Sequence, residues 1–184
     1  MNTENRLEIE VKVRIGTPPP WRAKLLALGA EVLAPRALER NLALDTPRKR
    51  LGKLGILLRL RGTEGRSVLT MKRPARAPEG AAYKVREETE ADVSDFSAME
   101  RILRGIGFRP FFIYEKYREV FRMGGVSVML DETPIGNFLE IEGETAEIDK
   151  AAALLGFSRG DYISDSYYRL FLLSGRAGDM VFSK

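Results

Sequence analysis

Charged and apolar residues alternate in the segment LEIEVKVRI near the start of the chain. Glu8, Glu10, Lys12 and Arg14 occupy every second position, and Leu, Ile or Val stands between them. Side chains of a β-strand alternate between its two faces, so this spacing predicts a strand with one charged and one apolar face. Most such strands simply expose the polar face to solvent. Whether these charges have a chemical role depends on the pattern in the other predicted strands.

The same alternation returns in each later segment that has the period of a strand. The charged faces contain few of the Thr, Ser, Gln and Asn residues that solvated sheet faces usually mix with charges. Acidic residues are concentrated on the first and last of these segments. The charged positions are Lys12, Arg14, Arg59, Arg61, Lys72, Lys84, Arg86, Lys116 and Arg118, with Glu8, Glu10, Glu88, Glu90, Asp131, Glu140 and Glu142.

A closed barrel with its charged faces inward accounts for this pattern. If the strands close in order, the first and last become neighbours, and Glu8, Glu10, Glu140 and Glu142 form a cluster. Such a cluster is repulsive unless a cation lies in it. The apolar faces then point outward and need cover from helices or from a second subunit, so we expect a homodimer.

A tunnel with one carboxylate wall and otherwise basic walls suits a polyanion that binds together with divalent metal ions. Lys and Arg bind phosphate oxygens, and carboxylates hold the ions that bridge them, so a triphosphate meets both demands. The chain has no Cys and no His, which excludes thiolate and imidazole chemistry. A metal would therefore need oxygen ligands, and the prediction is Mg²⁺ or Mn²⁺.

The elements that carry these residues follow from periodicity, glycines and prolines. We predict strands at residues 7–15, 37–45, 81–91 and 138–144, two strands within 55–74 that turn at 62–65, and a hairpin of 111–123 and 126–132. The glycines at 124–125 suit a type I′ turn. Helices are expected at 21–29, 94–107 (capped by Ser94 or Ser97), 146–156 and 164–175, with a loop at 74–80 and a frayed tail from 175.

Length and composition predict a single domain over residues 1–184, long enough for a real core. The net charge is +4, but 26 acidic residues accompany the 30 basic ones and no basic patch or tail stands out. We therefore expect no nucleic-acid partner. No apolar segment has the length of a membrane span, and no signal peptide is visible, so we expect a cytoplasmic protein without a membrane partner.

An ordered set of motifs resembles the CYTH superfamily, the triphosphate tunnel metalloenzymes. Glu8-Ile9-Glu10-Val11-Lys12 matches the Glu-x-Glu-x-Lys signature of the first strand. LDTP, LRLR, TMK, KVREETE, EKYR and LDETPIGNFLEIE follow in the family's order, so that the resemblance covers nearly the whole chain. It implies an α+β fold, a closed eight-stranded antiparallel β-barrel with flanking helices.

The resemblance also implies roles for individual positions. The implied metal ligands are Glu8, Glu10, Asp131, Glu140 and Glu142. The implied triphosphate contacts are Lys12, Arg59, Arg61, Lys72, Arg86, Lys116 and Arg118, and the catalytic group is Lys12 with Glu10 and Glu140. Glu88 is expected to orient a neighbouring cation, whereas Lys84 and Arg14 fit a barrel rim equally well.

Family members include triphosphatases and class IV adenylyl cyclases. Where such cyclases carry Gln-x-Asp-x-Tyr-Phe, this chain has Glu39-Arg40-Asn41-Leu42-Ala43-Leu44, without the aromatic and the acid. It also lacks a His near Asp131, and it has Asp165 where a basic residue is common. The resemblance therefore favours hydrolysis of an inorganic or organic triphosphate (tripolyphosphate, thiamine triphosphate or a nucleotide), with inorganic chains slightly ahead. Adenylyl cyclase and a non-catalytic polyphosphate- or nucleotide-binding protein are the alternatives.

Two substitutions distinguish the tunnel hypothesis from the alternative that the charged face is simply exposed to solvent. Glu10→Gln is expected to abolish activity and to leave the fold intact or steadier, because it removes one acid from a repulsive cluster. Glu119 lies on the opposite face of its strand, and Glu119→Gln is expected to have almost no effect.

Overall fold

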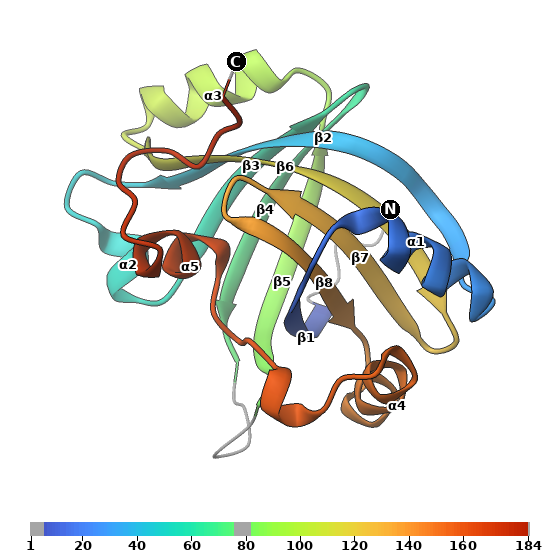
Figure 1. The fold of residues 1–184 in the computed structure, drawn as a ribbon. Helices are drawn as coiled ribbons and strands as arrows, with labels where there is room; N and C mark the ends of the chain where they lie inside the picture. The colour runs from blue at the N-terminus through green and yellow to red at the C-terminus, as the bar shows by residue number, and fades with distance from the viewer. Residues whose placement is uncertain (1–5, 76–81, 184) are drawn as a thin grey trace.

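The computed structural model describes residues 6–75 and 82–183, and within them eight antiparallel strands form a closed β-barrel (Figure 1). The loop predicted at residues 74–80 lies mostly outside the described residues. The strands are β1 (Arg6–Ile15), β2 (Glu31–Asp45), β3 (Leu57–Thr63), β4 (Arg66–Pro74), β5 (Lys84–Val93), β6 (Arg109–Met123), β7 (Val126–Thr133) and β8 (Gly136–Glu142). The predicted fold class is therefore confirmed.

The strands follow one another around the barrel in the order β1-β5-β4-β3-β2-β6-β7-β8. The first and last strands are neighbours as expected, but β1 does not pair with β2. A helix separates these two strands in the chain, whereas hairpin pairing needs a short turn. β1 instead lies between β5 and β8, with Glu8 opposite Arg86 and Lys12 opposite Glu140.

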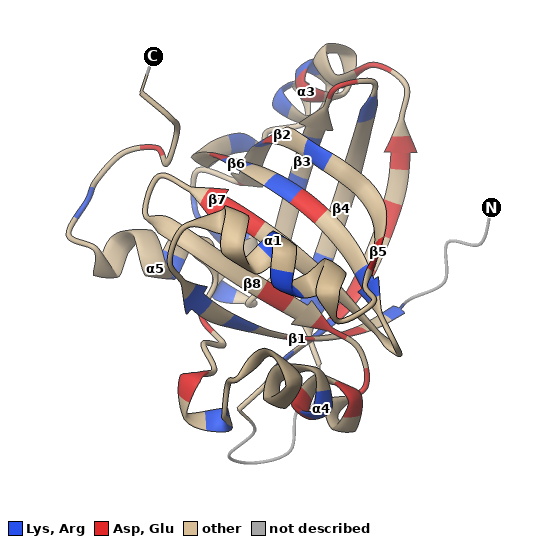
Figure 2. Cartoon of the chain, turned by 45° about the vertical axis from the view of Figure 1, so that its right-hand side comes forward, with Lys and Arg blue, Asp and Glu red and all other residues tan. Residues whose placement is uncertain are grey.

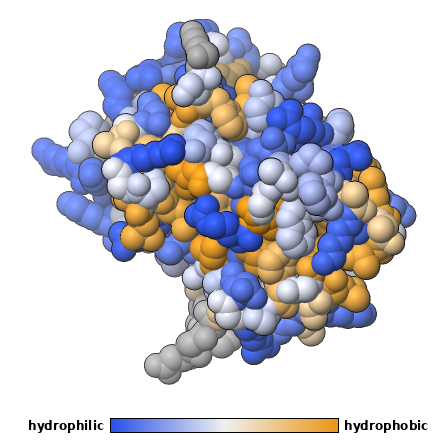
Figure 3. All heavy atoms as spheres, in the orientation of Figure 1, coloured by the Kyte–Doolittle hydropathy of each residue, from blue (hydrophilic) through white to orange (hydrophobic). Residues whose placement is uncertain are grey.

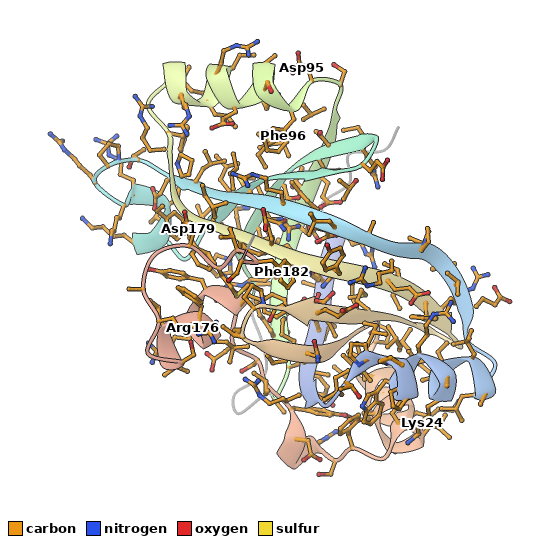
Figure 4. The ribbon with its side chains drawn as sticks, turned by 45° about the horizontal axis from the view of Figure 1, so that its top comes forward. Lys24, Asp95, Phe96, Arg176, Asp179 and Phe182 are labelled. Carbon is orange, nitrogen blue, oxygen red and sulfur yellow. The ribbon has the colours of Figure 1, made fainter. Side chains whose placement is uncertain are left out.

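Helices cover the outward apolar faces of the barrel (Figure 1). α1 (Pro18–Ala27) and α4 (Thr145–Leu155) bury the outer face of β1, β7 and β8, including Val11, Leu139 and Ile141. The ammonium of Lys24 in α1 donates to the carbonyl of Leu155 at 2.7 Å, so the two helices also contact each other (Figure 4).

The opposite side of the barrel has its own helix. α3 (Phe96–Gly105) covers an apolar cluster on β2 and β3 that contains Leu42 and Leu60. Its cap is Asp95, whose carboxylate accepts from the backbone N–H of Ala98 at 2.8 Å, rather than Ser94 or Ser97. The short helix α2 (Arg50–Lys53) was not predicted, because it is a single turn. The Asp45 carboxylate holds this turn by accepting from the N–H groups of Leu51 and Gly52.

The end of the described chain closes one end of the barrel. α5 (Tyr167–Leu173) inserts Tyr167 and Phe171 among Phe112 and Phe138 of the inner face. The tail that follows is not frayed, because Met180 exchanges two backbone hydrogen bonds with β6, at 2.9 and 2.8 Å. β7 pairs only with the second half of β6, so the first half has a free edge, and the tail occupies it. Phe182 lies farther along against Tyr117 (Figure 4).

Two further details concern the turn of the long hairpin and the surface. Gly124 has φ +58° but Gly125 does not have a positive φ, which excludes the type I′ turn. Apolar side chains are exposed near the end of α1 and the start of β2, at Leu26, Val32 and Leu33, and Figure 3 shows apolar groups at that side. The homodimer stays a prediction. Among the described helices, none has the length and apolar character to cross a lipid bilayer.

Candidate active site in the barrel tunnel

Charged residues recur along the strands of the barrel (Figure 2), and the alternation of side chains places most of the buried ones inside it. Charges inside a protein require partners, because transfer from water is strongly unfavourable. Here acids and bases pair with each other across neighbouring strands. The ionisable groups that are buried in the tunnel are Glu8, Glu10, Lys12, Glu39, Arg59, Lys72, Lys116, Asp131 and Glu140.

Lys12 lies between two glutamates in the acidic wall. Its Nζ is 2.8 Å from Glu10 Oε1 and 2.9 Å from Glu140 Oε2. Burial lowers the pKa of Lys12, but the two carboxylates outweigh it and raise that pKa above its ordinary value. Lys12 is therefore charged at neutral pH, and it can stabilise negative charge but cannot accept a proton.

Glu10 is held in its ionised form by the same network. Burial and the charge of Glu140 raise the pKa of Glu10, but Lys12, Lys84 and Lys72 outweigh both and lower it to about 2. The Lys84 ammonium bonds the oxygen of Glu10 that Lys12 also contacts. Glu10 is thus compensated by neighbouring cations.

Glu8 and Glu142 form the least compensated part of the acidic wall, with one ion pair each. One oxygen of Glu8 accepts from Lys72, while Oε2 is buried without a hydrogen-bond partner among the described residues. Glu142 pairs with Arg6 at 2.6 Å, yet burial, and then the charge of Glu8, raise the pKa of Glu142 to about 7. Two carboxylates that repel each other in this way provide a place for a cation.

Asp131 is the centre of a second group, on β7 beside the acidic wall of β1 and β8. Its carboxylate accepts two hydrogen bonds from the Arg118 guanidinium at 2.6 Å each and one from the Lys116 ammonium at 3.0 Å. The Tyr167 hydroxyl donates a fourth, at 2.6 Å. Arg118 also donates to Glu140 at 2.9 Å, so this group is joined to the acidic wall.

The remaining tunnel cations are positioned by polar neighbours. Arg59 donates to the Thr70 hydroxyl at 3.3 Å and to the Tyr114 hydroxyl at 3.4 Å. Lys72 Nζ is 3.3 Å from Glu88 Oε1, which agrees with the expectation that Glu88 orients a neighbouring cation.

Some predicted residues lie nearer the rim of the barrel. Arg86 donates to the Gly55 carbonyl at 2.9 Å, and Arg14 is exposed, donates to the Ile135 carbonyl at 3.0 Å and stacks over Phe138. Lys84, by contrast, reaches Glu10 inside the tunnel. Arg86 therefore stands apart from the other proposed phosphate contacts.

Sequence reasoning did not select several residues of the site. Glu39 and Asn41 share the tunnel face of β2, and Tyr114 shares that of β6 with Lys116, so the rule of alternation could have found all three. Tyr167 had no such signal, because it reaches the tunnel from a helix. Its ring lies 5.3 Å from Lys12 Nζ and 5.0 Å from Lys116 Nζ.

The acidic wall fits a hard divalent cation, but only together with a phosphate ligand. Within residues 6–75 and 82–183, no group of three acidic side chains could hold a metal by itself. Mg²⁺ is commonly bound by one or two carboxylates with substrate phosphates and water completing its shell. Glu8 and Glu142 are the pair most available for this, because each contacts one cation, Lys72 or Arg6. Glu10, Glu140 and Asp131 each contact two.

A family model for the CYTH domain matches residues 6–167. The chain belongs to the CYTH family. The match extends from the start of β1 to the first residue of α5, so it includes every strand of the tunnel. CYTH proteins are in general metal-dependent, which agrees with the character of the acidic wall.

Solved structures with the same fold extend the comparison. A suggested adenylate cyclase from Vibrio parahaemolyticus has a TM-score of 0.78 at 20% identity, covering 92% of this chain and 99% of that one. A Pyrococcus horikoshii protein has a TM-score of 0.70 at 26% identity (92% and 99% covered). A suggested adenylyl cyclase from Hippeastrum, described as having a dominant triphosphatase activity, has a TM-score of 0.63 at 26% identity (92% and 97%). No curated protein sequence matches this CYTH chain.

Proposed function

We propose that this CYTH protein hydrolyses triphosphates with the help of Mg²⁺ or Mn²⁺. The observation that carries the proposal is a tunnel that combines largely buried cations with two carboxylates, Glu8 and Glu142, that repel each other and have one ion pair each. The cations are Lys12, Lys72, Lys116, Arg59 and Arg118. A protein that only binds a polyanion needs the bases but has no use for Glu8 and Glu142. Hydrolysis uses both, because a bound divalent ion neutralises phosphate charge and generates a nucleophile from water.

The residues of the chain have separable tasks in this proposal. Lys116, Arg118 and Arg59 bind phosphate oxygens and fix the orientation of the triphosphate. Lys12 remains charged between Glu10 and Glu140, so it stabilises the negative charge that develops on the transferred phosphoryl group. Tyr167 and its aromatic neighbours close one end of the tunnel and exclude water from that side.

The second candidate is adenylyl cyclase, because structures with the same fold are described as suggested adenylate cyclases. Both reactions bind a triphosphate, and they differ in whether water or a ribose hydroxyl attacks. Ala43 is buried against Phe112 and Tyr114, so β2 offers no aromatic side chain of its own at this position. The proposal therefore ranks hydrolysis first.

One experiment separates these functions. The purified protein is incubated with ATP, thiamine triphosphate and tripolyphosphate, each with Mg²⁺, Mn²⁺ or excess chelator, and phosphate, pyrophosphate and cyclic AMP are quantified. We expect metal-dependent phosphate release, and we expect Lys12→Ala to abolish it. Faster formation of cyclic AMP and pyrophosphate would establish the cyclase. Tight binding without any product would establish a binding protein.

A further inference from the structure

Four buried polar atoms on the β2–β3 side of the tunnel have no hydrogen-bond partner among the described residues. They are Glu39 Oε2, Asn41 Oδ1, Arg59 Nε and Arg61 Nε. Glu39, Asn41 and Arg59 are 6%, 0% and 6% exposed, and Asn41 is opposite Arg61 in the register of β2 and β3. Buried polar atoms are normally hydrogen-bonded, so a group of unpaired ones on adjacent strands marks a place that a ligand completes.

The unpaired atoms include acceptors as well as donors. The guanidinium nitrogens of Arg59 and Arg61 donate, whereas the free oxygens of Glu39 and Asn41 accept. Asn41 uses its amide N–H₂ toward the Tyr114 carbonyl, at 3.5 Å, which leaves its oxygen unpaired. An ionised phosphate chain offers only acceptor oxygens. It can satisfy the two arginines, but it cannot satisfy Glu39 or Asn41.

Glu39 also places a negative charge within the basic wall. Oε1 accepts from Arg61 at 3.2 Å, and Oε2 is 3.7 Å from Lys116 Nζ. Burial raises the pKa of Glu39, but Lys116, Arg118 and Arg61 outweigh it and lower it to about 2. The carboxylate is therefore ionised at neutral pH. It repels an additional phosphate group and attracts a group that carries N–H or O–H.

We propose that Glu39 and Asn41 form a specificity subsite for a hydrogen-bond donor carried beside the phosphate chain, so that the substrate is an organic triphosphate with N–H or O–H groups. This inference rests on the proposed action on triphosphates. It departs from the slight preference for inorganic chains that the missing aromatic at Ala43 suggests. Ala43 argues against ring stacking on β2, whereas donation to Glu39 and Asn41 requires no stacking.

The test compares kcat and KM for ATP, thiamine triphosphate and tripolyphosphate. We expect the wild type to prefer one organic substrate over tripolyphosphate by about tenfold or more in kcat/KM, since a site with buried polar groups rejects a ligand that leaves them unpaired. Asn41→Leu should raise KM for that organic substrate about tenfold and leave tripolyphosphate unchanged. Glu39→Gln should lower KM for tripolyphosphate and thereby reduce the preference for the organic substrate in kcat/KM. Arg40→Gln, on the outward face of the same strand, is the matched control and should leave kcat and KM unchanged for both substrates.

Calorimetric binding of tripolyphosphate and of a non-hydrolysable ATP analogue, with Mg²⁺, keeps this inference separate from the proposed function. If the wild type hydrolyses nothing, hydrolysis is refuted, while the order of affinities still tests the subsite. A wild type that favours tripolyphosphate overturns the inference. The inference is also overturned if each variant changes the dissociation constants of both ligands by the same factor. That result is expected if ordered water fills the subsite. If Asn41→Leu fails to fold, the nearly isosteric Glu39→Gln decides.

Discussion

Individual charges in the tunnel differ in how well their neighbours compensate them. Glu10 has Lys12 and Lys84 within bonding distance, whereas Glu142 has Arg6 on one side and the repelling Glu8 on the other. The same chemical change, Glu to Gln, should therefore have opposite consequences for stability at the two positions. This difference modifies the expectation from sequence that removal of Glu10 relieves repulsion.

Glu10→Gln is expected to abolish turnover and also to destabilise the fold. It leaves the buried ammonium groups of Lys12 and Lys84 with less compensating charge, and loss of one partner of a buried ion pair costs about 3 kcal/mol. Thermal unfolding and phosphate release measure the two effects. Glu142→Gln is the matched control for stability, and it should leave the melting temperature unchanged or higher. Equal losses of melting temperature in both variants would contradict this account of the acidic wall.

At the scale of elements, ion pairs outside the tunnel fasten the helices to the barrel. The Glu119 carboxylate is buried on the outer face of β6 and accepts two hydrogen bonds, at 3.1 and 3.0 Å, from Arg22 of α1. The prediction that Glu119→Gln has almost no effect assumed a solvated outer face. The structure instead makes this residue a link between a strand and a helix.

Glu119→Gln should lower the melting temperature while kcat/KM stays at the wild-type value. Arg22 is half exposed, so the effect corresponds to about 1 kcal/mol rather than to that of a fully buried pair. Urea unfolding provides the free energy, and the phosphate-release assay provides the kinetic comparison. A fall in kcat/KM without a change in stability would show that Glu119 communicates with the tunnel.

A second link depends on pH. Asp149 of α4 accepts from the hydroxyls of Tyr83 and Tyr162, at 2.6 and 2.9 Å, and from Arg159. The hydrogen bond from Arg159 is the main reason that the pKa of Asp149 is lowered to about 2, and the two tyrosines add to it. Because the folded-state pKa lies below the ordinary value of 3.8, the stabilisation is complete above pH 3.8 and is lost as the pH falls through about 2.

Asp149→Asn should therefore reduce stability most at neutral pH. The difference in melting temperature between wild type and variant is expected to shrink between pH 4 and pH 2. Differential scanning calorimetry across this range measures it. A difference that grows toward acidic pH would exclude the assigned role of the Asp149 carboxylate.

At the scale of the whole molecule, the tunnel contains matched positive and negative charges that bind each other. Lys72 holds Glu8, Lys12 holds Glu10 and Glu140, and Arg118 holds Asp131. A triphosphate that takes the cations leaves the carboxylates without partners, and a metal ion that takes the carboxylates leaves the cations without partners. Each ligand thus removes the penalty that the other creates.

Cation and anion should accordingly bind with positive cooperativity. Mg²⁺ alone or a non-hydrolysable triphosphate alone is expected to raise the melting temperature only slightly, and both together by more than the sum. A thermal-shift titration over both concentrations measures the coupling without any catalytic turnover. Glu8→Gln should weaken the coupling, because it removes one of the two carboxylates proposed to hold the cation. Additive shifts in the wild type would show that the two ligands do not exchange partners in this way.

The sequence was sufficient to predict which charged side chains face into the barrel, because the side a residue takes in a strand depends only on local alternation. Lys12, Lys116 and Asp131 are buried inside the barrel as that rule requires. Strand order and the closure of the tunnel depend on distant parts of the chain. The place of β1 between β5 and β8, and the reach of Tyr167 to Asp131, are set by tertiary packing and leave no periodic signal.

The position of β1 has a consequence for the chain during its synthesis on the ribosome. Both strands that flank β1 are made much later, since β5 begins at Lys84 and β8 at Gly136. At ordinary rates of translation, β1 waits on the order of ten seconds for its second partner. An unpaired apolar strand invites aggregation, and charged residues are the usual protection. The charges on β1 should therefore oppose aggregation of the nascent chain, before any ligand binds. They are Glu8, Glu10, Lys12 and Arg14.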